Sequence, residues 1–240
     1  MAIKKHIPNC ITLCNLFCGI VAILLAVNGM LKNAAFMVIL ASVFDFLDGL
    51  VARALHVKSD IGKELDSLSD IVSFGVAPAF IMYYMLCYSS DYMTQYWGIR
   101  IMPFVISAAY PCCAALRLAK FNIDTQQTDK FYGLPVPAAA FVIISLQFYE
   151  VGIYAAAIYN KGKRESMAIV ILLCFAMLSR FPLLALKFKN LTIKDNIFRY
   201  ALIGISLVLI ICLKFKAILF IMMFYFILSI IYSIIYGKEK

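Results

Sequence analysis

Long apolar stretches follow one another along almost the whole chain, and they limit the folds that it can adopt. A helix needs roughly 20 mostly apolar residues to cross the hydrocarbon core of a bilayer. Eight stretches of about this length can be marked: 9–29, 33–56, 60–88, 97–119, 135–159, 165–187, 197–213 and 215–236. The connections between them are short and leave no room for a separate soluble domain. The sequence therefore predicts an all-α integral membrane protein.

The number of spans stays open at six to eight. The last two stretches, the extra C-terminal spans at about 197–236, are short and weakly separated. Lys214 and Lys216 mark either a tight turn between them or a place where lysines reach from a span to the membrane surface. Residues 1–8 are basic and end at Pro8, and we expect them to form a short interfacial segment before the first span.

The distribution of basic residues predicts the orientation. Most Lys and Arg residues fall in the alternate loops that share a side with the N-terminus, which places both termini in the cytoplasm. The short loop with Lys161, Lys163 and Arg164 goes against this bias. The net charge of +9 sits mainly in short loops beside the membrane. Membrane lipids with anionic headgroups are therefore expected partners, and nucleic acid is not.

Four carboxylates interrupt the apolar pattern, at Asp45, Asp48, Asp66 and Asp70. An ionised side chain is costly inside a membrane, so a carboxylate there indicates a functional site. The spacings of three and four residues put each pair on one helix face. If stretches two and three form an antiparallel hairpin that turns near residues 57–58, the pairs meet at matching depths, about 13 and 19 Å from the turn. The sequence thus predicts one acidic site.

Four clustered carboxylates repel one another unless protons or cations neutralise them. Their oxygen atoms suit Mg²⁺, Mn²⁺ or Ca²⁺, and four of them suit two ions that clamp a phosphoryl displacement. Gly49 and Gly62 would let a ligand approach the backbone, and Arg53 has the planar fork that suits a pyrophosphate. Structural ion pairs and a cation-transport site are the alternatives. A single Arg53 cannot neutralise four carboxylates, and a transport site does not explain the glycines.

The stretch from residue 45 to 70, DFLDGLVARALHVKSDIGKELDSLSD, resembles the signature of the CDP-alcohol phosphatidyltransferase family, D-x2-D-G-x2-A-R-x8-G-x3-D-x3-D. All fixed positions are matched, by Asp45, Asp48, Gly49, Ala52, Arg53, Gly62, Asp66 and Asp70. The segments IPNCITLCNLFCG, SDIVSFGVAPA, RLAKFN and FYGLPVPAAA are similar to the phosphatidylserine synthase branch of that family. The resemblance covers about the first 140 residues.

The resemblance implies one transmembrane domain over residues 1–240 that transfers the phosphatidyl group of CDP-diacylglycerol to L-serine and releases CMP. It implies two divalent cations, Mg²⁺ or Mn²⁺, with Ca²⁺ as a possible inhibitor or substitute. Asp45, Asp48 and Asp66 would bind the metal pair, and Asp70 would be a further ligand, the general base, or both. A homodimer in a bacterial inner membrane, with its active site facing the cytoplasm, is also implied.

The remaining roles concern the two substrates. By the resemblance, Gly49, Ala52, Arg53 and Gly62 surround the CDP moiety. Thr12 and Asn15 are expected to line the nucleotide pocket or, alternatively, to bridge two helices. Arg117 suits the carboxylate of serine, although a surface anchor at the end of stretch 97–119 is the alternative, and Asn122 is a weaker candidate. Glycerol 3-phosphate, inositol phosphate or an ether-lipid donor would use the same chemistry.

Overall fold

The computed structural model describes residues 2–57, 59–87, 97–123, 131–148, 155–179, 182–183 and 196–236. The structure is helical apart from one short strand pair in this part of the chain. Its α-helices are α1 Ala2–Val27, α2 Leu31–Ala54, α3 Asp60–Asp70, α4 Ala77–Cys87, α5 Trp97–Ile123, α6 Val136–Ser145, α7 Ala155–Leu178, α8 Ile197–Leu213 and α9 Ala217–Tyr236. A π-helix, η1 Ile71–Val76, joins α3 to α4, and the 3₁₀ segments η3 Leu146–Phe148 and η5 Lys214–Lys216 follow α6 and α8.

Each of the eight predicted apolar stretches corresponds to a helical segment, because α3, η1 and α4 run on as one stretch. Five segments among the described residues are long and apolar enough to cross a membrane: His6–Val27, Leu31–Ala54, Asp60–Cys87, Ile101–Ile123 and Ile197–Tyr232. The helices at Val136–Phe148 and Ser166–Leu178 are apolar but shorter. The predicted all-α polytopic membrane fold is therefore confirmed.

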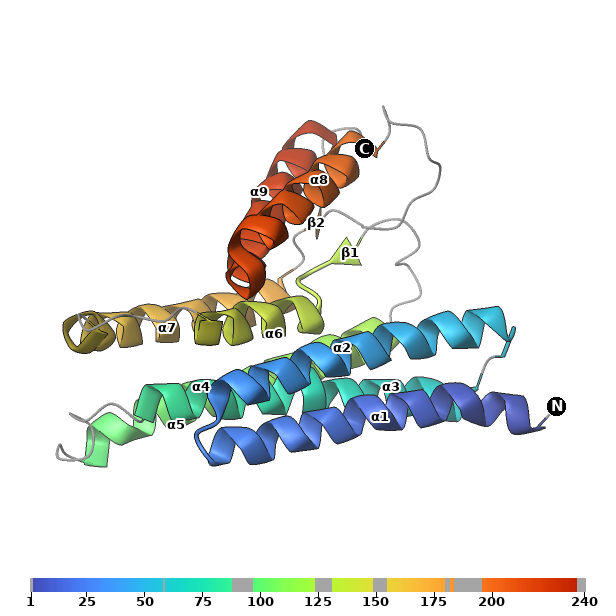
Figure 1. The fold of residues 1–240 in the computed structure, drawn as a ribbon, viewed down its shortest axis with the longest axis horizontal. Coiled ribbons are helices and arrows are strands. Elements are labelled where there is room, and N and C mark those ends of the chain that lie inside the picture. Colours follow the sequence, from blue (N-terminus) through green and yellow to red (C-terminus); the bar gives the residue numbers. More distant parts are fainter. Residues whose placement is uncertain are drawn as a thin grey trace.

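The first five α-helices run side by side and form the part of the molecule that carries the acidic residues (Figure 1). α1 packs along α2, α3 and α4, and its close contact with α2 is made by small buried side chains such as Ala22, Ala26, Ala34 and Ala35. Small residues let two helix backbones approach each other within a membrane. α6 and α7 lie along one side of this group in roughly the same direction, and α8 and α9 form an inclined hairpin (Figure 1).

Two predicted boundaries differ from the structure. Residues 2–7 belong to the continuous helix α1, with Pro8 inside it, so the expected N-terminal segment is the helical start of α1, and the apolar span within this helix begins at His6. Residues 155–165 belong to α7, so the loop expected around Lys161 is helical and the predicted boundary at 159–165 is wrong. The tight turn between α8 and α9 is confirmed, because Lys214 adopts a positive φ of 52° there. The C-terminal end of predicted stretch 165–187 lies outside the described residues.

A short strand pair was not predicted. β1, Phe131–Tyr132, pairs in antiparallel register with β2, Pro182–Leu183. Gly133 follows β1 with a positive φ of 76°, and a Cβ added there would lie 2.7 Å from the backbone oxygens of Met177 and Ser179. This close approach holds the start of α6 against the C-terminal end of α7. It also determines the surroundings of Arg117, whose Nε would be 3.4 Å from that Cβ.

Candidate active site

Three carboxylates from two helices meet near the turn between α2 and α3. Ligand oxygens of Asp45, Asp48 and Asp66 lie within 4.8 Å of one another. Asp48 is buried and the other two are half-buried. Within the described part of the chain, the Oδ1 atom of Asp66 is buried and has no hydrogen-bond partner. An all-oxygen cluster with an unsatisfied carboxylate oxygen fits a hard divalent cation such as Mg²⁺ or Mn²⁺.

Helix α1 supports this cluster, which reasoning from the α2–α3 hairpin did not anticipate. The Thr12 hydroxyl lies 2.6 Å from Oδ2 of Asp48 and 3.1 Å from the backbone oxygen of Pro8. Thr12 is only 3% exposed. Because α1 packs on both α2 and α3, the carboxylates meet around a third helix.

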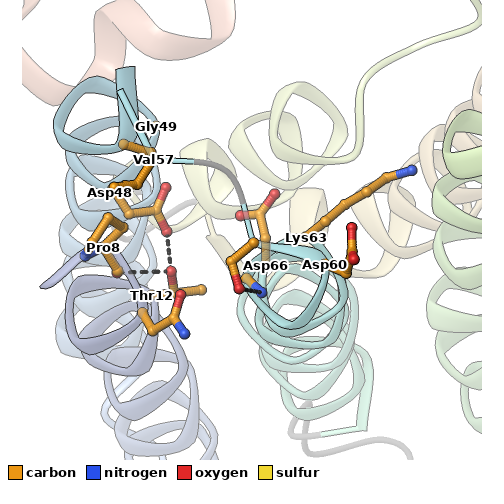
Figure 2. A pocket seen from close by; sticks show the side chains of 12 residues that line it. Pro8, Thr12, Asp48, Gly49, Val57, Asp60, Lys63 and Asp66 are labelled. Atoms are coloured by element: carbon orange, nitrogen blue, oxygen red, sulfur yellow. Dashed lines mark hydrogen bonds between the residues drawn. The ribbon is translucent and has the colours of Figure 1, made fainter. Parts of the chain in front are cut away.

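A cavity of about 400 Å³ opens beside Asp48 and Asp66. Figure 2 shows Thr12 and Asp48 on one side of it and Asp60, Lys63 and Asp66 on α3 across from them. The cavity is lined by Pro8, Asn9, Thr12, Asp48, Gly49, Ala52, Val57, Ser59, Asp60, Gly62, Lys63 and Asp66. It therefore brings together Thr12, Gly49, Ala52 and Gly62, as the sequence predicted for one pocket.

The signature glycines differ in their surroundings. A Cβ added at Gly62 would lie 3.0 Å from Oδ1 of Asn9 on α1, so a larger residue would press on that helix. At Gly49 the space beside the backbone is open, with only the Nη2 atom of Arg53 at 4.0 Å. Arg53 is exposed and is not among the residues that line the cavity. Its guanidinium lies beside Gly49, at the outer edge of the site.

Asp70 lines a different cavity. This space of about 150 Å³ is formed by Asp70, Arg117, Leu118, Phe121, Pro135, Val136 and Pro137. Arg117 is 6% exposed, its guanidinium carbon lies 5.6 Å from the ring centre of Phe121, and its Nη2 atom lies 3.5 Å from the backbone oxygen of Gly133. A side chain that anchors a helix at the membrane surface would be exposed. The burial of Arg117 therefore favours a role inside this cavity.

Asn15, which we expected to line the nucleotide pocket, contacts Asp70 instead. Its Nδ2 atom donates to Oδ1 of Asp70 over 3.2 Å, and both side chains are buried. Asn15 is not among the residues that line the larger cavity. Thr12 and Asn15, one turn apart on α1, thus bind aspartates that face different cavities.

Asn122 takes part in a hydrogen-bond network between α5 and α3. Its Nδ2 atom donates to Oγ of Ser67 over 2.8 Å, and its backbone oxygen accepts from Nζ of Lys63 over 3.1 Å. It is not among the residues that line the Asp70 cavity. The network ties the last turn of α5 to the helix that carries Asp66 and Asp70.

Several lining residues were not predicted from the sequence. Pro135 and Pro137 lie at the start of α6, and both line the Asp70 cavity together with Val136. Asn9, Ser59 and Asp60 line the larger cavity. The Ser59 hydroxyl accepts from the backbone N–H of Gly62 over 3.3 Å and caps α3. Serine is a favoured N-cap residue, so Ser59 indicates a helix start. That signal does not show that this end of the helix faces a ligand.

Comparisons with known proteins identify the family to which the chain belongs. The family model described as CDP-alcohol phosphatidyltransferase matches residues 5–236. The chain is 35% identical over 144 residues to the CDP-diacylglycerol–serine O-phosphatidyltransferase of Bacillus subtilis, covering 60% of this chain and 76% of that protein. It is 31% identical over 207 residues to the protein of the same name from Helicobacter pylori, covering 84% and 80%.

An archaeal relative has a different name, which also contains serine. The archaetidylserine synthase of Methanothermobacter thermautotrophicus is 40% identical over 152 residues, covering 62% of this chain and 60% of that protein. Since the family model extends over nearly the whole chain, the protein belongs to the CDP-alcohol phosphatidyltransferase family.

Proposed function

We propose that the protein transfers the phosphatidyl group of CDP-diacylglycerol to L-serine and forms phosphatidylserine and CMP. One observation carries this proposal: two cavities of different size and chemistry flank the aspartates. The larger is lined by aspartates and glycines, and the smaller by Asp70 and a buried arginine. Such an arrangement suits a large charged donor on one side and a small acceptor with a carboxylate on the other. The names of the relatives support serine as that acceptor.

The larger cavity would hold the CDP moiety. Its open backbone at Gly49 leaves room for the nucleotide, and Ala52 and Gly62 line the same space. Lys63 lines this cavity as well and would add positive charge near the pyrophosphate. Arg53, beside Gly49, would contact the phosphates from the outer edge once a nucleotide is bound.

Asp45, Asp48 and Asp66 would hold the divalent cations, with Asp70 as a further ligand. When bound, two such ions neutralise the negative charge of the pyrophosphate and of the leaving phosphate. The unsatisfied Oδ1 atom of Asp66 supports this assignment. Mg²⁺ and Mn²⁺ both fit the oxygen ligands, and Ca²⁺ would bind with a looser geometry.

The smaller cavity would hold serine. Arg117 would bind the serine carboxylate with two parallel hydrogen bonds, the geometry that guanidinium groups favour. This would direct the serine hydroxyl toward Asp70, which lines the same cavity. A buried ion pair between Arg117 and the acceptor would select against alcohols that lack a negative group, and the small volume of the cavity, about 150 Å³, would disfavour the bulkier glycerol 3-phosphate and inositol phosphate.

The reaction would be a single displacement. Asp70 accepts the proton of the serine hydroxyl as its oxygen bonds to the phosphorus nearer the lipid. The bond from that phosphorus to the oxygen of CMP breaks, and CMP leaves with the electron pair. The proton passes from Asp70 to solvent or to the leaving phosphate. Holding both reactants in line beside fixed charges would supply most of the rate acceleration.

The active site would face the cytoplasm of a bacterium, with the protein in its inner membrane as a homodimer. The N-terminal end of α1 and the connection from α2 to α3 lie at the same end of the helix group (Figure 1), and the cavity with Asp48 and Asp66 takes lining residues from both. CDP-lipid and serine would reach the site from that side. The bias of basic residues in the sequence supports this orientation.

One assay tests the proposal. Purified protein in detergent is incubated with CDP-diacylglycerol, Mn²⁺ or Mg²⁺, and one alcohol at a time, and CMP release is followed. We expect release with L-serine and little with glycerol 3-phosphate or inositol phosphate. A parallel arm with a CDP-activated ether lipid distinguishes the two donors that the relatives' names suggest. Absence of CMP release with every alcohol would contradict the proposal and favour a cation-transport site.

A further inference from the structure

We infer that Asn15 is a positioning residue for Asp70: its amide holds Oδ1 of Asp70 so that Oδ2 is presented to the acceptor hydroxyl. This inference rests on the proposed function and adds to it a contribution from the first span. The contact is direct, with Nδ2 of Asn15 3.2 Å from Oδ1 of Asp70. Asn15 is fully buried and Asp70 is 8% exposed, so solvent does not compete for this bond.

The hydrogen-bonding state of Asn15 argues against a purely structural role. Its Oδ1 atom is buried and has no hydrogen-bond partner among the residues that the structure describes. Leaving a buried acceptor unsatisfied is unfavourable. An amide that only joined two helices would be expected to use both of its ends. Here the amide uses only the donor end, and that donor is directed at the proposed base.

The backbone around Asn15 is also held in place. The Ser73 hydroxyl of η1 donates to the backbone oxygen of Asn15 over 3.0 Å. One turn later, Gly19 lets α1 approach η1 so closely that an added Cβ would lie 2.8 Å from Cα of Ser73. Ser73 follows Asp70 by three residues, so both ends of the Asn15–Asp70 contact are fixed to the same short segment. The carboxylate orientation is thereby set by packing, before any substrate arrives.

The test compares Asn15 with Thr12, its matched partner on α1. Asn15→Leu keeps a similar shape but removes the donor. We expect it to lower kcat for serine-dependent CMP release by about 10- to 100-fold, because small misplacements of a reacting group have effects of this size. The KM for CDP-diacylglycerol and the Mn²⁺ dependence should change by less than about twofold. Thr12→Val should show the opposite pattern. It should change kcat little and raise the CDP-diacylglycerol and Mn²⁺ concentrations required.

Each outcome decides the inference. An Asn15→Leu enzyme with kcat within about twofold of the wild type overturns the inference. A variant with unchanged kcat and a higher KM for CDP-diacylglycerol also overturns it, because that result would assign Asn15 to the nucleotide pocket. Thermal unfolding in detergent checks the fold. If the leucine variant does not fold, Asn15→Ser, which is smaller and cannot reach Asp70, gives the same comparison. A wild-type protein that releases no CMP with serine contradicts the proposed function itself, whereas an active wild type with an unaffected variant contradicts only this inference.

Discussion

The two cavities beside the aspartates are built from different parts of the chain. The larger one is formed by α1, α2, α3 and the turn that follows α2, all within residues 8–66. The smaller one combines Asp70 with residues 117–121 of α5 and residues 135–137 at the start of α6. The family signature covers most of the first cavity and only one residue of the second. The proposed donor side is therefore encoded locally, whereas the proposed acceptor side depends on how three distant segments pack.

This difference leads to separate expectations for the two sides. Changes at the larger cavity should alter the use of CDP-lipid and metal. Changes at the smaller cavity should alter the use of serine or the rate of the chemical step. The strongest test acts on both sides at once, because the cations would lie between them.

Metal removal should have the largest effect. After treatment with a chelator, serine-dependent CMP release should fall below detection, because the charge of the pyrophosphate would no longer be neutralised. Adding back Mg²⁺ or Mn²⁺ should restore the activity, and the release assay measures both steps. Full activity in the presence of excess chelator would show that the aspartate cluster does not work through bound cations.

Asp70→Asn should reduce kcat by about 10²- to 10⁴-fold, the range expected when a general base is lost. Binding of CDP-diacylglycerol, measured by calorimetry or by competition with labelled nucleotide, should persist because Asp70 does not line the larger cavity. The control is Asp66→Asn, which should raise the metal concentration required more than Asp70→Asn does, because Asp66 belongs to the group of three carboxylates. Near-normal turnover by Asp70→Asn would mean that another group accepts the proton.

Arg117→Met should raise the KM for serine by about 10- to 100-fold, which corresponds to the loss of a charge-assisted interaction of about 1.5–3 kcal/mol. The KM for CDP-diacylglycerol should change little. Lys120→Met is the matched control, since Lys120 is an exposed basic residue one turn later on α5. Equal effects of the two variants would point to general surface charge and away from a serine site.

Asn122→Ala should have the smallest effect. It removes the bond to Ser67 between α5 and α3, which we expect to lower stability by about 1 kcal/mol. The KM for serine should change less than about threefold, as steady-state kinetics can show. An increase comparable to that of Arg117→Met would return Asn122 to the acceptor site, as the sequence had suggested.

The fold was largely predictable because bilayer thickness imposes a length on each apolar stretch. The exception is residues 155–165, where the charges of Lys161 and its neighbours were taken to indicate a loop. Charged residues also occur within helices, where long side chains can reach the membrane surface.

The meeting of Asp45, Asp48 and Asp66 was predictable from their spacing, whereas Asp70, which the spacing placed in the same site, lies outside this group and lines a separate cavity. The contact between Asn15 and Asp70 was not predictable, because it depends on the close packing of α1 on η1, and periodicity carries no information on which helices touch.

The π-helix after Asp70 affects which insertions and deletions the sequence can accept at this point. A π-turn holds about one residue more than the α-turn that it replaces. One residue added to an uninterrupted α-helix would rotate everything after it by about 100° around the helix axis. The π-turn confines the extra residue to a local bulge, so α4 keeps nearly the orientation relative to Asp66 and Asp70 that a regular α-helix one residue shorter would give it. The Tyr110 hydroxyl donates to the backbone oxygen of Phe74 within this bulge, over 3.1 Å. Sequences that align here with a one-residue gap should therefore lack the bulge but keep the packing of α4 against α5.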